Sequence, residues 1–180
     1  MKKFLTLLVL LLSVGYPFIV YFGLQNIDAK WLIPLLISIL ALRWYVSEQA
    51  EQRTIIVITL VILVCILTFS GYQFGLKFYP VMMNFSFFIL FAGSLLTPTS
   101  IVEKFARLKE PDLPVEAKIY TRKVTMVWSV FFIFNGSIAC FTALYASDET
   151  WMLYNGFIAY ILMGVLGATE WVVRQRVVKA

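Results

Sequence analysis

Six long apolar stretches constrain the fold of this chain more than any other feature. They occupy residues 4–24, 31–46, 54–72, 78–96, 124–146 and 151–173. A helix needs about 20 apolar residues to cross the hydrocarbon core of a bilayer, and each stretch approaches that length. The connections are too short to form a separately folded domain. We therefore predict an all-α fold, a single integral membrane domain over residues 1–180 with a bundle of six transmembrane helices.

The composition supports this interpretation. Hydrophobic residues make up 61% of the chain and charged residues only 14%, with a mean hydropathy of +0.87, which is far from the composition of a soluble domain. The first stretch begins like a signal peptide, because two basic residues, Lys2 and Lys3, precede an apolar run. The run stays apolar through Pro17 and Tyr21, which is longer than the apolar region of a typical signal peptide. An uncleaved first span is therefore favoured, and the sequence leaves cleavage open.

The distribution of lysine and arginine predicts the orientation of the bundle. Cytoplasmic segments of membrane proteins are enriched in these residues. With the N-terminus inside, only Lys30 and Lys77 of the 15 basic residues fall on the outer side. We therefore predict a bacterial inner-membrane protein with cytoplasmic N- and C-termini. A cleaved first span would leave the orientation of the rest unchanged.

The charged residues, the cysteines and the lack of histidine argue against several functional classes. The net charge of +5 is divided among separate cytoplasmic turns, whereas a nucleic-acid groove needs basic residues interleaved with aromatic ones. The chain has no histidine, and Cys65 and Cys140 lie in apolar runs without a second ligand at a metal-like spacing. We predict no nucleic-acid binding, no metal or other cofactor, no disulfide and no catalytic activity.

A capping box predicts a short amphipathic helix between the fourth and fifth spans. In the S-x-x-E pattern of Ser100 and Glu103, each side chain would satisfy a backbone donor at the helix start. Ile101, Phe105 and Leu108 would share one face, with Glu103 pointing away. We expect this helix to lie on the inner leaflet.

Prolines organise the chain that follows this helix. Pro111 would end it, and Pro114 suits the first turn of the next helix, where a missing amide donor does no harm. The next residues recur at helical spacing, and they are Leu113, Ala117, Tyr120 and Val124.

The cytoplasmic loop, residues 97–123, has two interpretations. It is either an elbow that anchors the fifth span or a docking surface for a cytoplasmic or membrane partner. The candidate docking residues are Phe105, Arg107, Lys109, Asp112, Tyr120 and Arg122.

Polar residues within spans are the usual pointers to function in membrane proteins. Asn135 and Asn155 begin the matching patterns NGSIA and NGFIA. Asparagine can bond across helices and glycine allows close approach, so we expect these patterns to pack the fifth and sixth spans together. A ligand site there is the alternative.

Glu170 is the one carboxylate inside a predicted span. Arg174 follows four residues later, in the favourable order for a helical ion pair, and Arg43 should lie at a similar depth. We expect a structural pair, with proton coupling in a transporter as the alternative. Arg43 itself lies one turn before the end of its span, from where it could reach the interface.

The second half of the chain resembles known families. Residues 76–173 contain LKFYPVMMNFSFFILFAGSLL, EPDLP, YTRKVTMVWSVFFIFNGSIA and WMLYNGFIAYILMG. This part resembles an uncharacterised bacterial inner-membrane family that accompanies fatty-acid-synthase-like enzymes in aryl polyene and xanthomonadin-type clusters. It more distantly resembles the intracellular septation protein A family, whose shared features correspond here to Trp128, Phe131, Phe132 and Asn135.

The resemblance implies a role in cell-envelope or polyene-lipid biogenesis and supplies no catalytic residue. We therefore expect an inner-membrane accessory or scaffold protein, whose partners are the bilayer and enzymes of such a pathway. A transporter or flippase for a lipid or hydrophobic product is the alternative, and a homo-oligomer is left open.

Overall fold

The computed structural model describes residues 2–47, 50–108 and 110–178, which are almost entirely helical and contain no strand. The helical elements are α1 (Lys2–Asn26), a 3₁₀ turn (Ala29–Leu32), α2 (Ile33–Val46), α3 (Ala50–Ser70), α4 (Tyr72–Ser94), α5 (Ile101–Arg107), α6 (Val115–Tyr145), α7 (Asp148–Leu153), a π turn (Tyr154–Ile158) and α8 (Ala159–Val178).

Five helical segments of the described chain are long and apolar enough to cross a membrane. They are Phe4–Asn26, Ala29–Val46, Tyr72–Ser94, Val115–Tyr145 and Asp148–Gln175. A shorter apolar stretch, Ile56–Thr68, lies within α3. The predicted all-α membrane fold is confirmed, and these lengths are compatible with six spans.

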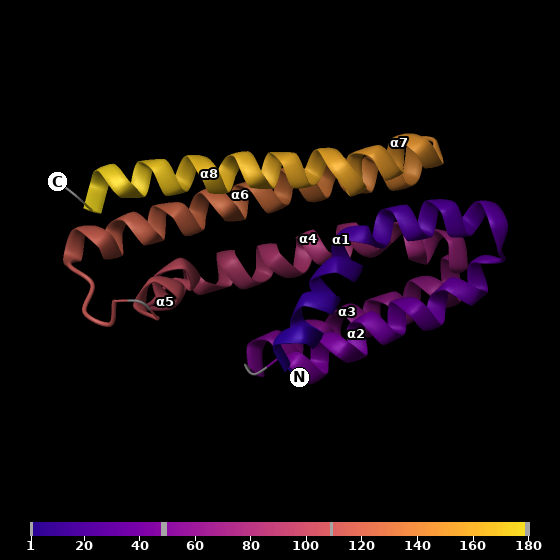
Figure 1. The fold of residues 1–180 in the computed structure, drawn as a ribbon, viewed down its shortest axis with the longest axis horizontal. Coiled ribbons are helices and arrows are strands. Elements are labelled where there is room, and N and C mark those ends of the chain that lie inside the picture. Colours follow the sequence, from indigo (N-terminus) through magenta and orange to yellow (C-terminus); the bar gives the residue numbers. More distant parts are fainter. Residues whose placement is uncertain (1, 48–49, 109, 179–180) are drawn as a thin grey trace.

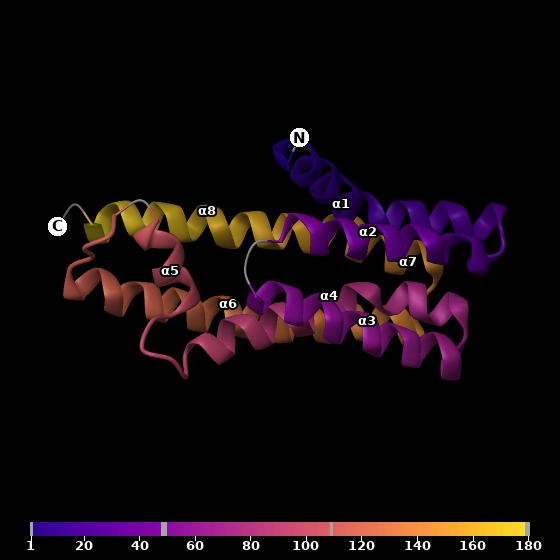
Figure 2. The ribbon, with the colours of Figure 1, turned by 90° about the horizontal axis from the view of Figure 1, so that it is seen from below.

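The long helices lie roughly along the long axis of the molecule (Figure 1). The connections after α1, α3 and α6 gather at the right-hand end of that view, and α5 and the C-terminal end of α8 lie at the opposite end. Figure 2 shows that the N-terminal half of α1 diverges from the other helices. Pro17 lies within α1, and a proline inside a helix is a common cause of such a bend.

The core lies in the half of the bundle where α1, α2, α3, α4 and α7 meet. Its fully buried side chains include Leu36, Ile39, Leu63, Leu76 and Trp151. The Trp151 indole Nε1 donates to the Lys77 carbonyl at 3.1 Å. Because apolar surface surrounds the indole and its one polar group is paired, Trp151 anchors α7 against α4.

The connection between α3 and α4 is shorter than the sequence suggested. Gly71 alone joins the two helices, with a φ of 84°, a left-handed conformation that glycine adopts without steric cost. Gly75 and Lys77, which fall between the predicted spans 54–72 and 78–96, therefore lie inside α4. Lys77 forms an ion pair with Asp148 at the start of α7.

Two further boundaries differ from the predicted ones. α6 begins at Val115, so more than two helical turns precede residue 124, where the fifth span was expected to start. Ala117 and Val124 are buried on one face of this extension, as their spacing predicted. The sixth span was expected to be one continuous helix, but the π turn interrupts it at Tyr154–Ile158.

Candidate functional site

The capping prediction for α5 is correct for the serine. The Ser100 hydroxyl accepts from the Glu103 amide at 3.4 Å, and the Ile101 amide donates to the Ser94 hydroxyl at 2.9 Å. The other half of the box is absent among the described residues. The Glu103 carboxylate instead accepts from Arg107, so a salt bridge one turn later replaces the contact back to Ser100.

The prediction for α5 is wrong for Glu103, which was expected to point away, and for Ile101, which is buried rather than exposed beside Phe105 and Leu108. Glu103 is 5% exposed, whereas Phe105 is 49% and Leu108 is 82% exposed. The reason is the pair itself, because Arg107 Nε and Nη2 lie 3.0 and 2.8 Å from one Glu103 oxygen. With its charge matched in this way, the carboxylate can be buried between α5 and α6, while Phe105 and Leu108 face outward.

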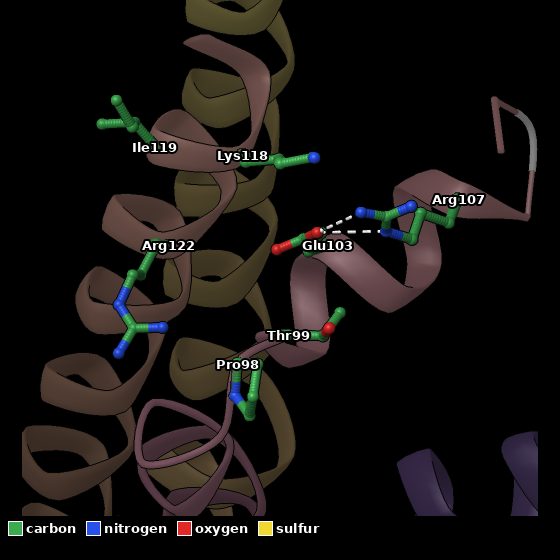
Figure 3. Close-up of a pocket in the computed structure, with 7 residues that line it drawn as sticks. All are labelled: Pro98, Thr99, Glu103, Arg107, Lys118, Ile119 and Arg122. Carbon is green, nitrogen blue, oxygen red and sulfur yellow. Dashed lines mark hydrogen bonds and ion pairs between the residues drawn. The ribbon is translucent and has the colours of Figure 1, made fainter. Parts of the chain in front are cut away.

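A cavity of about 280 Å³ opens beside this pair. Figure 3 shows α5 on one side and the first turns of α6 on the other, with Glu103 pointing between them. Its lining residues are Pro98, Thr99, Glu103, Arg107, Lys118, Ile119 and Arg122. We call this cavity the α5–α6 pocket.

Arg122 joins the pocket to the end of α4. Its Nη1 donates to the Thr97 carbonyl at 3.3 Å, and its Nη2 donates to the Leu95 carbonyl. These carbonyls follow the last turn of α4, where helical partners run out. Arg122 therefore stabilises the turn that leads into α5.

The α5–α6 pocket is cationic. Arg107 is matched by Glu103, whereas Lys118 and Arg122 form no ion pair among the described residues, and Ile119 adds an apolar edge. Such a lining would suit a ligand or peptide segment in which an acidic group lies next to an apolar one. Sequence reasoning did not place Glu103 or Lys118 in a site, although Arg107 four residues after Glu103 was a usable signal.

The remaining docking candidates are dispersed around the pocket. Phe105 and Asp112 are exposed outside it. Tyr120 is half-buried, and its hydroxyl donates to the Glu170 carbonyl at 3.1 Å, which ties α6 to α8. Lys109 lies outside the described residues.

Asn135 belongs to a buried hydrogen-bonded cluster at membrane depth. Its Nδ2 donates to Asn84 Oδ1 at 2.9 Å, and its Oδ1 accepts from the Tyr154 hydroxyl at 2.8 Å. Asn84 Nδ2 in turn donates to the Pro80 carbonyl at 2.9 Å. We call Asn84, Asn135 and Tyr154 the asparagine cluster; it links α4, α6 and the π turn.

Asn155 is also buried, but it makes separate contacts. Its Nδ2 donates to Thr142 Oγ1 at 3.1 Å and to the Trp151 carbonyl at 2.9 Å. The fifth and sixth spans are thus linked through asparagine side chains, as the two matching patterns suggested.

The prediction for the glycines in these patterns is wrong. A methyl group on Gly136 would lie 3.0 Å from the Asn84 Cβ, and one on Gly156 would lie 2.8 Å from the Phe18 ring. Gly136 therefore allows α6 to approach α4 closely, and Gly156 allows the π turn to approach α1. Neither glycine brings the fifth and sixth spans together. A π turn contains an extra residue, which rotates Gly156 away from the register of a regular helix.

Glu170 and Arg174 form the expected pair, with Arg174 Nε 3.9 Å from the carboxylate. Arg43, for which the sequence suggested a position at the interface, contacts α4 in the structure. Its Nη1 donates to the Tyr79 hydroxyl at 3.4 Å and to Met83 Sδ at 3.0 Å, both on α4. This contact follows from the direction of the side chain, because helical side chains lean toward the N-terminus of their helix. Arg43 therefore leans away from the nearby end of α2.

Two tyrosines pair with carbonyls that prolines leave without a helical partner. A proline removes the bond to the carbonyl four residues earlier. For Pro17 this is the Ser13 carbonyl, which accepts from the Tyr160 hydroxyl at 3.1 Å. For Pro80 it is the Leu76 carbonyl, which accepts from the Tyr16 hydroxyl at 3.0 Å. Each proline site is thereby satisfied by a different helix, as membrane interiors require.

Comparison with known proteins gives one informative similarity. The chain is 26% identical over 148 residues to the inner membrane-spanning protein YciB of Cronobacter sakazakii (strain ATCC BAA-894), covering 78% of this chain and 81% of that protein. No protein-family model matches the chain, and no solved structure matches it. The similarity supports the resemblance to the intracellular septation proteins. Together with the membrane-length helices, it identifies an inner-membrane protein that is distantly homologous to YciB.

Proposed function

We propose that this protein is a non-catalytic accessory protein of the inner membrane that holds a cytoplasmic partner at the α5–α6 pocket during cell-envelope biogenesis. The observation that carries the proposal is the pocket itself, a cationic cavity of about 280 Å³ next to exposed apolar side chains. The distant homology to an inner membrane-spanning protein supports the location. Residues 76–173 resemble a family that accompanies fatty-acid-synthase-like enzymes in biosynthesis clusters, and this resemblance supports the envelope role.

The surface around the pocket combines the two properties that a docking segment needs. Leu108, Val115 and Ile119 are exposed apolar residues, and Lys118 and Arg122 line the pocket together with Ile119. Exposed apolar groups edged by charge are typical of interaction sites. A partner segment with acidic and apolar side chains would match this pattern. In the narrower form of the proposal, that partner is an enzyme that makes a polyene lipid.

Site-specific photo-crosslinking in cells tests the docking surface. A photoreactive amino acid at Phe105 or Ile119, both exposed near the pocket, should yield a defined protein adduct. The same probe at Tyr145, which is exposed at the opposite end of α6, should not yield that adduct. Lipid adducts alone from Phe105 and Ile119 would refute the proposal.

A charge reversal separates docking from general membrane contact. Lys118→Glu changes a pocket residue that has no ion-pair partner among the described residues, so the adduct from Ile119 should fall several-fold. Lys104→Glu is the matched control, because Lys104 is exposed on α5 and does not line the pocket. An equal loss in both variants would show that the pocket does not direct the adduct.

Transport of a lipid or hydrophobic product is the second candidate. Asn135 and Asn155 give transport little support, because both side chains are buried and their amide groups already form hydrogen bonds within the protein. The observation that favours it is Arg43, a cation that points into the bundle. Proton coupling through Glu170 would be tested by Glu170→Gln, and unchanged coupled flux in vesicles would remove Glu170 from that role.

A further inference from the structure

Arg43 is placed where a cation is costly. Its guanidinium lies against α4, where Tyr79 is about two turns from the start of the helix. Tyr79 is buried and Arg43 is half-buried. A charge at membrane depth needs a partner, and such residues in membrane proteins usually mark functional sites.

No carboxylate of the described residues supplies that partner. The ion pairs among them join Lys30 to Asp28, Lys77 to Asp148, Arg107 to Glu103 and Arg174 to Glu170. The hydroxyl and thioether that Arg43 contacts carry no negative charge. A guanidinium has five N–H donors in a planar fork, and the contacts in the described chain use only Nη1.

Two further donors lie beside the guanidinium. The Tyr79 hydroxyl accepts from Arg43, and its own hydrogen can be donated to a ligand. The Ser13 hydroxyl of α1 is buried near Tyr79 but makes no hydrogen bond of ordinary geometry. A buried hydroxyl without a partner costs free energy. Tyr160 of α8 holds this part of α1 in place through the Ser13 carbonyl.

We propose that Arg43, Tyr79 and Ser13 bind the anionic headgroup, a carboxylate or a phosphate, of an amphiphile within the bundle. The anion would accept from the remaining guanidinium N–H groups and from the hydroxyls of Tyr79 and Ser13, which satisfies all three residues at once. Tyr160 is a positioning residue. Residues of three helices, α1, α2 and α4, therefore converge on one headgroup.

The surroundings favour an amphiphile over a free anion. Arg43 lies on α2, whose outward side chains Ile37, Trp44 and Tyr45 are exposed and largely apolar. An acyl or polyene chain could lie along this face while its headgroup reaches Arg43. This site is separate from the α5–α6 pocket, so the loss of one activity does not predict the loss of the other.

Thermal unfolding of the purified full-length chain in a non-ionic detergent tests the proposal. Palmitate and dioleoyl phosphatidic acid serve as anionic amphiphiles, with inorganic phosphate and dioleoyl phosphatidylcholine as comparisons. At least one anionic amphiphile should raise the unfolding temperature in a saturable manner. Equal stabilisation by inorganic phosphate would overturn the amphiphile assignment, and equal stabilisation by phosphatidylcholine would overturn recognition of the anion.

Variants locate the binding site. Arg43→Gln should weaken binding of the stabilising amphiphile at least tenfold, and Arg43→Lys less, because charge remains but the planar fork is lost. Lys104→Gln is the control. Lys104 is an exposed cation on α5 and belongs to neither the Arg43 site nor the apolar face of α2, so its loss should leave binding unchanged.

Ser13→Ala keeps the test decisive if Arg43→Gln does not fold. It removes a hydroxyl that has no ordinary hydrogen bond to lose, so the fold should persist while binding weakens several-fold. A palmitate analogue with a diazirine near its carboxylate should also label native-chain peptides that contain Arg43 or Tyr79. Unchanged binding in Ser13→Ala, or labelling confined to other helices, would refute the site.

Discussion

The asparagine cluster and the Arg43 site lie at membrane depth in the same bundle, yet they differ in how fully their polar groups are paired. Asn135 uses its amide nitrogen on Asn84 and its oxygen on Tyr154. Arg43 has one neutral hydroxyl, one sulfur and an unpaired serine nearby. The first arrangement is complete without a ligand. The second becomes complete only when an anion binds, so we assign packing to one and recognition to the other.

The asparagine cluster should give the largest loss of stability. Asn135→Ala leaves the Asn84 oxygen and the Tyr154 hydroxyl unpaired in a buried position, which should lower the free energy of unfolding by about 2–3 kcal/mol. Ser137→Ala, on the exposed face of the same helix, should change it by less than about 0.5 kcal/mol. Denaturation in mixed micelles measures both, and equal losses would show that the cluster is not a packing element.

The tyrosine contacts to the proline sites should give the next largest effect. Tyr16→Phe leaves the Leu76 carbonyl without a partner and should cost about 1–2 kcal/mol. Pro80→Ala restores an amide donor to that carbonyl, so Tyr16→Phe should cost less in the Pro80→Ala background. A double-mutant cycle measures the coupling. Tyr145→Phe, an exposed tyrosine, is the control, and additive costs would contradict this assignment.

Because α4 and α6 approach closely at the asparagine cluster, a substitution that adds a methyl group there should cause a smaller loss of stability. Gly136→Ala places a methyl group 3.0 Å from the Asn84 Cβ, and overpacking should outweigh the gain in helix propensity by about 1 kcal/mol. Gly164→Ala meets no atom within 4 Å and should stabilise by about 0.5 kcal/mol. If both variants shift the unfolding midpoint in the same direction, the helices are not in contact at Gly136.

The Arg43 site should give the smallest effect in the absence of a ligand. Arg43→Met keeps the length and removes a charge that has no carboxylate partner among the described residues. The free energy of unfolding should therefore fall by no more than about 0.5 kcal/mol, or rise. Unfolding in amphiphile-free detergent measures this. A loss as large as that of Asn135→Ala would mean that Arg43 is a packing residue and would remove the contrast between the two clusters.

The spans and the start of α5 were predictable because they depend on local sequence. Apolar length is a property of consecutive residues, and Ser100 caps the helix that begins directly after it. Glu103 was misassigned because two nearby partners compete for its carboxylate. The capping box offered the Ser100 amide, but the charged Arg107 side chain forms the stronger bond.

The polar contacts between helices could not be read from the sequence in the same way. Arg43 was judged by its distance from the end of its own helix, whereas the position of Tyr79 on α4 decides where its guanidinium lies. Asn84 was visible in the sequence, but its pairing with Asn135 depends on the register of α4 against α6. The π turn likewise depends on tertiary packing and has no signal in local propensity.

The length of α6 has a consequence for the α5–α6 pocket. Its 31 residues span about 46 Å at 1.5 Å per residue, whereas the hydrocarbon core of a bilayer is about 30 Å thick. With the far end of α6 at one boundary, the first turns of the helix protrude from the other. Bilayer thickness would then determine how far Lys118 and Arg122 stand clear of the headgroups. Membranes with longer acyl chains would draw the pocket toward the lipid surface, and shorter ones would lift it further away from that surface.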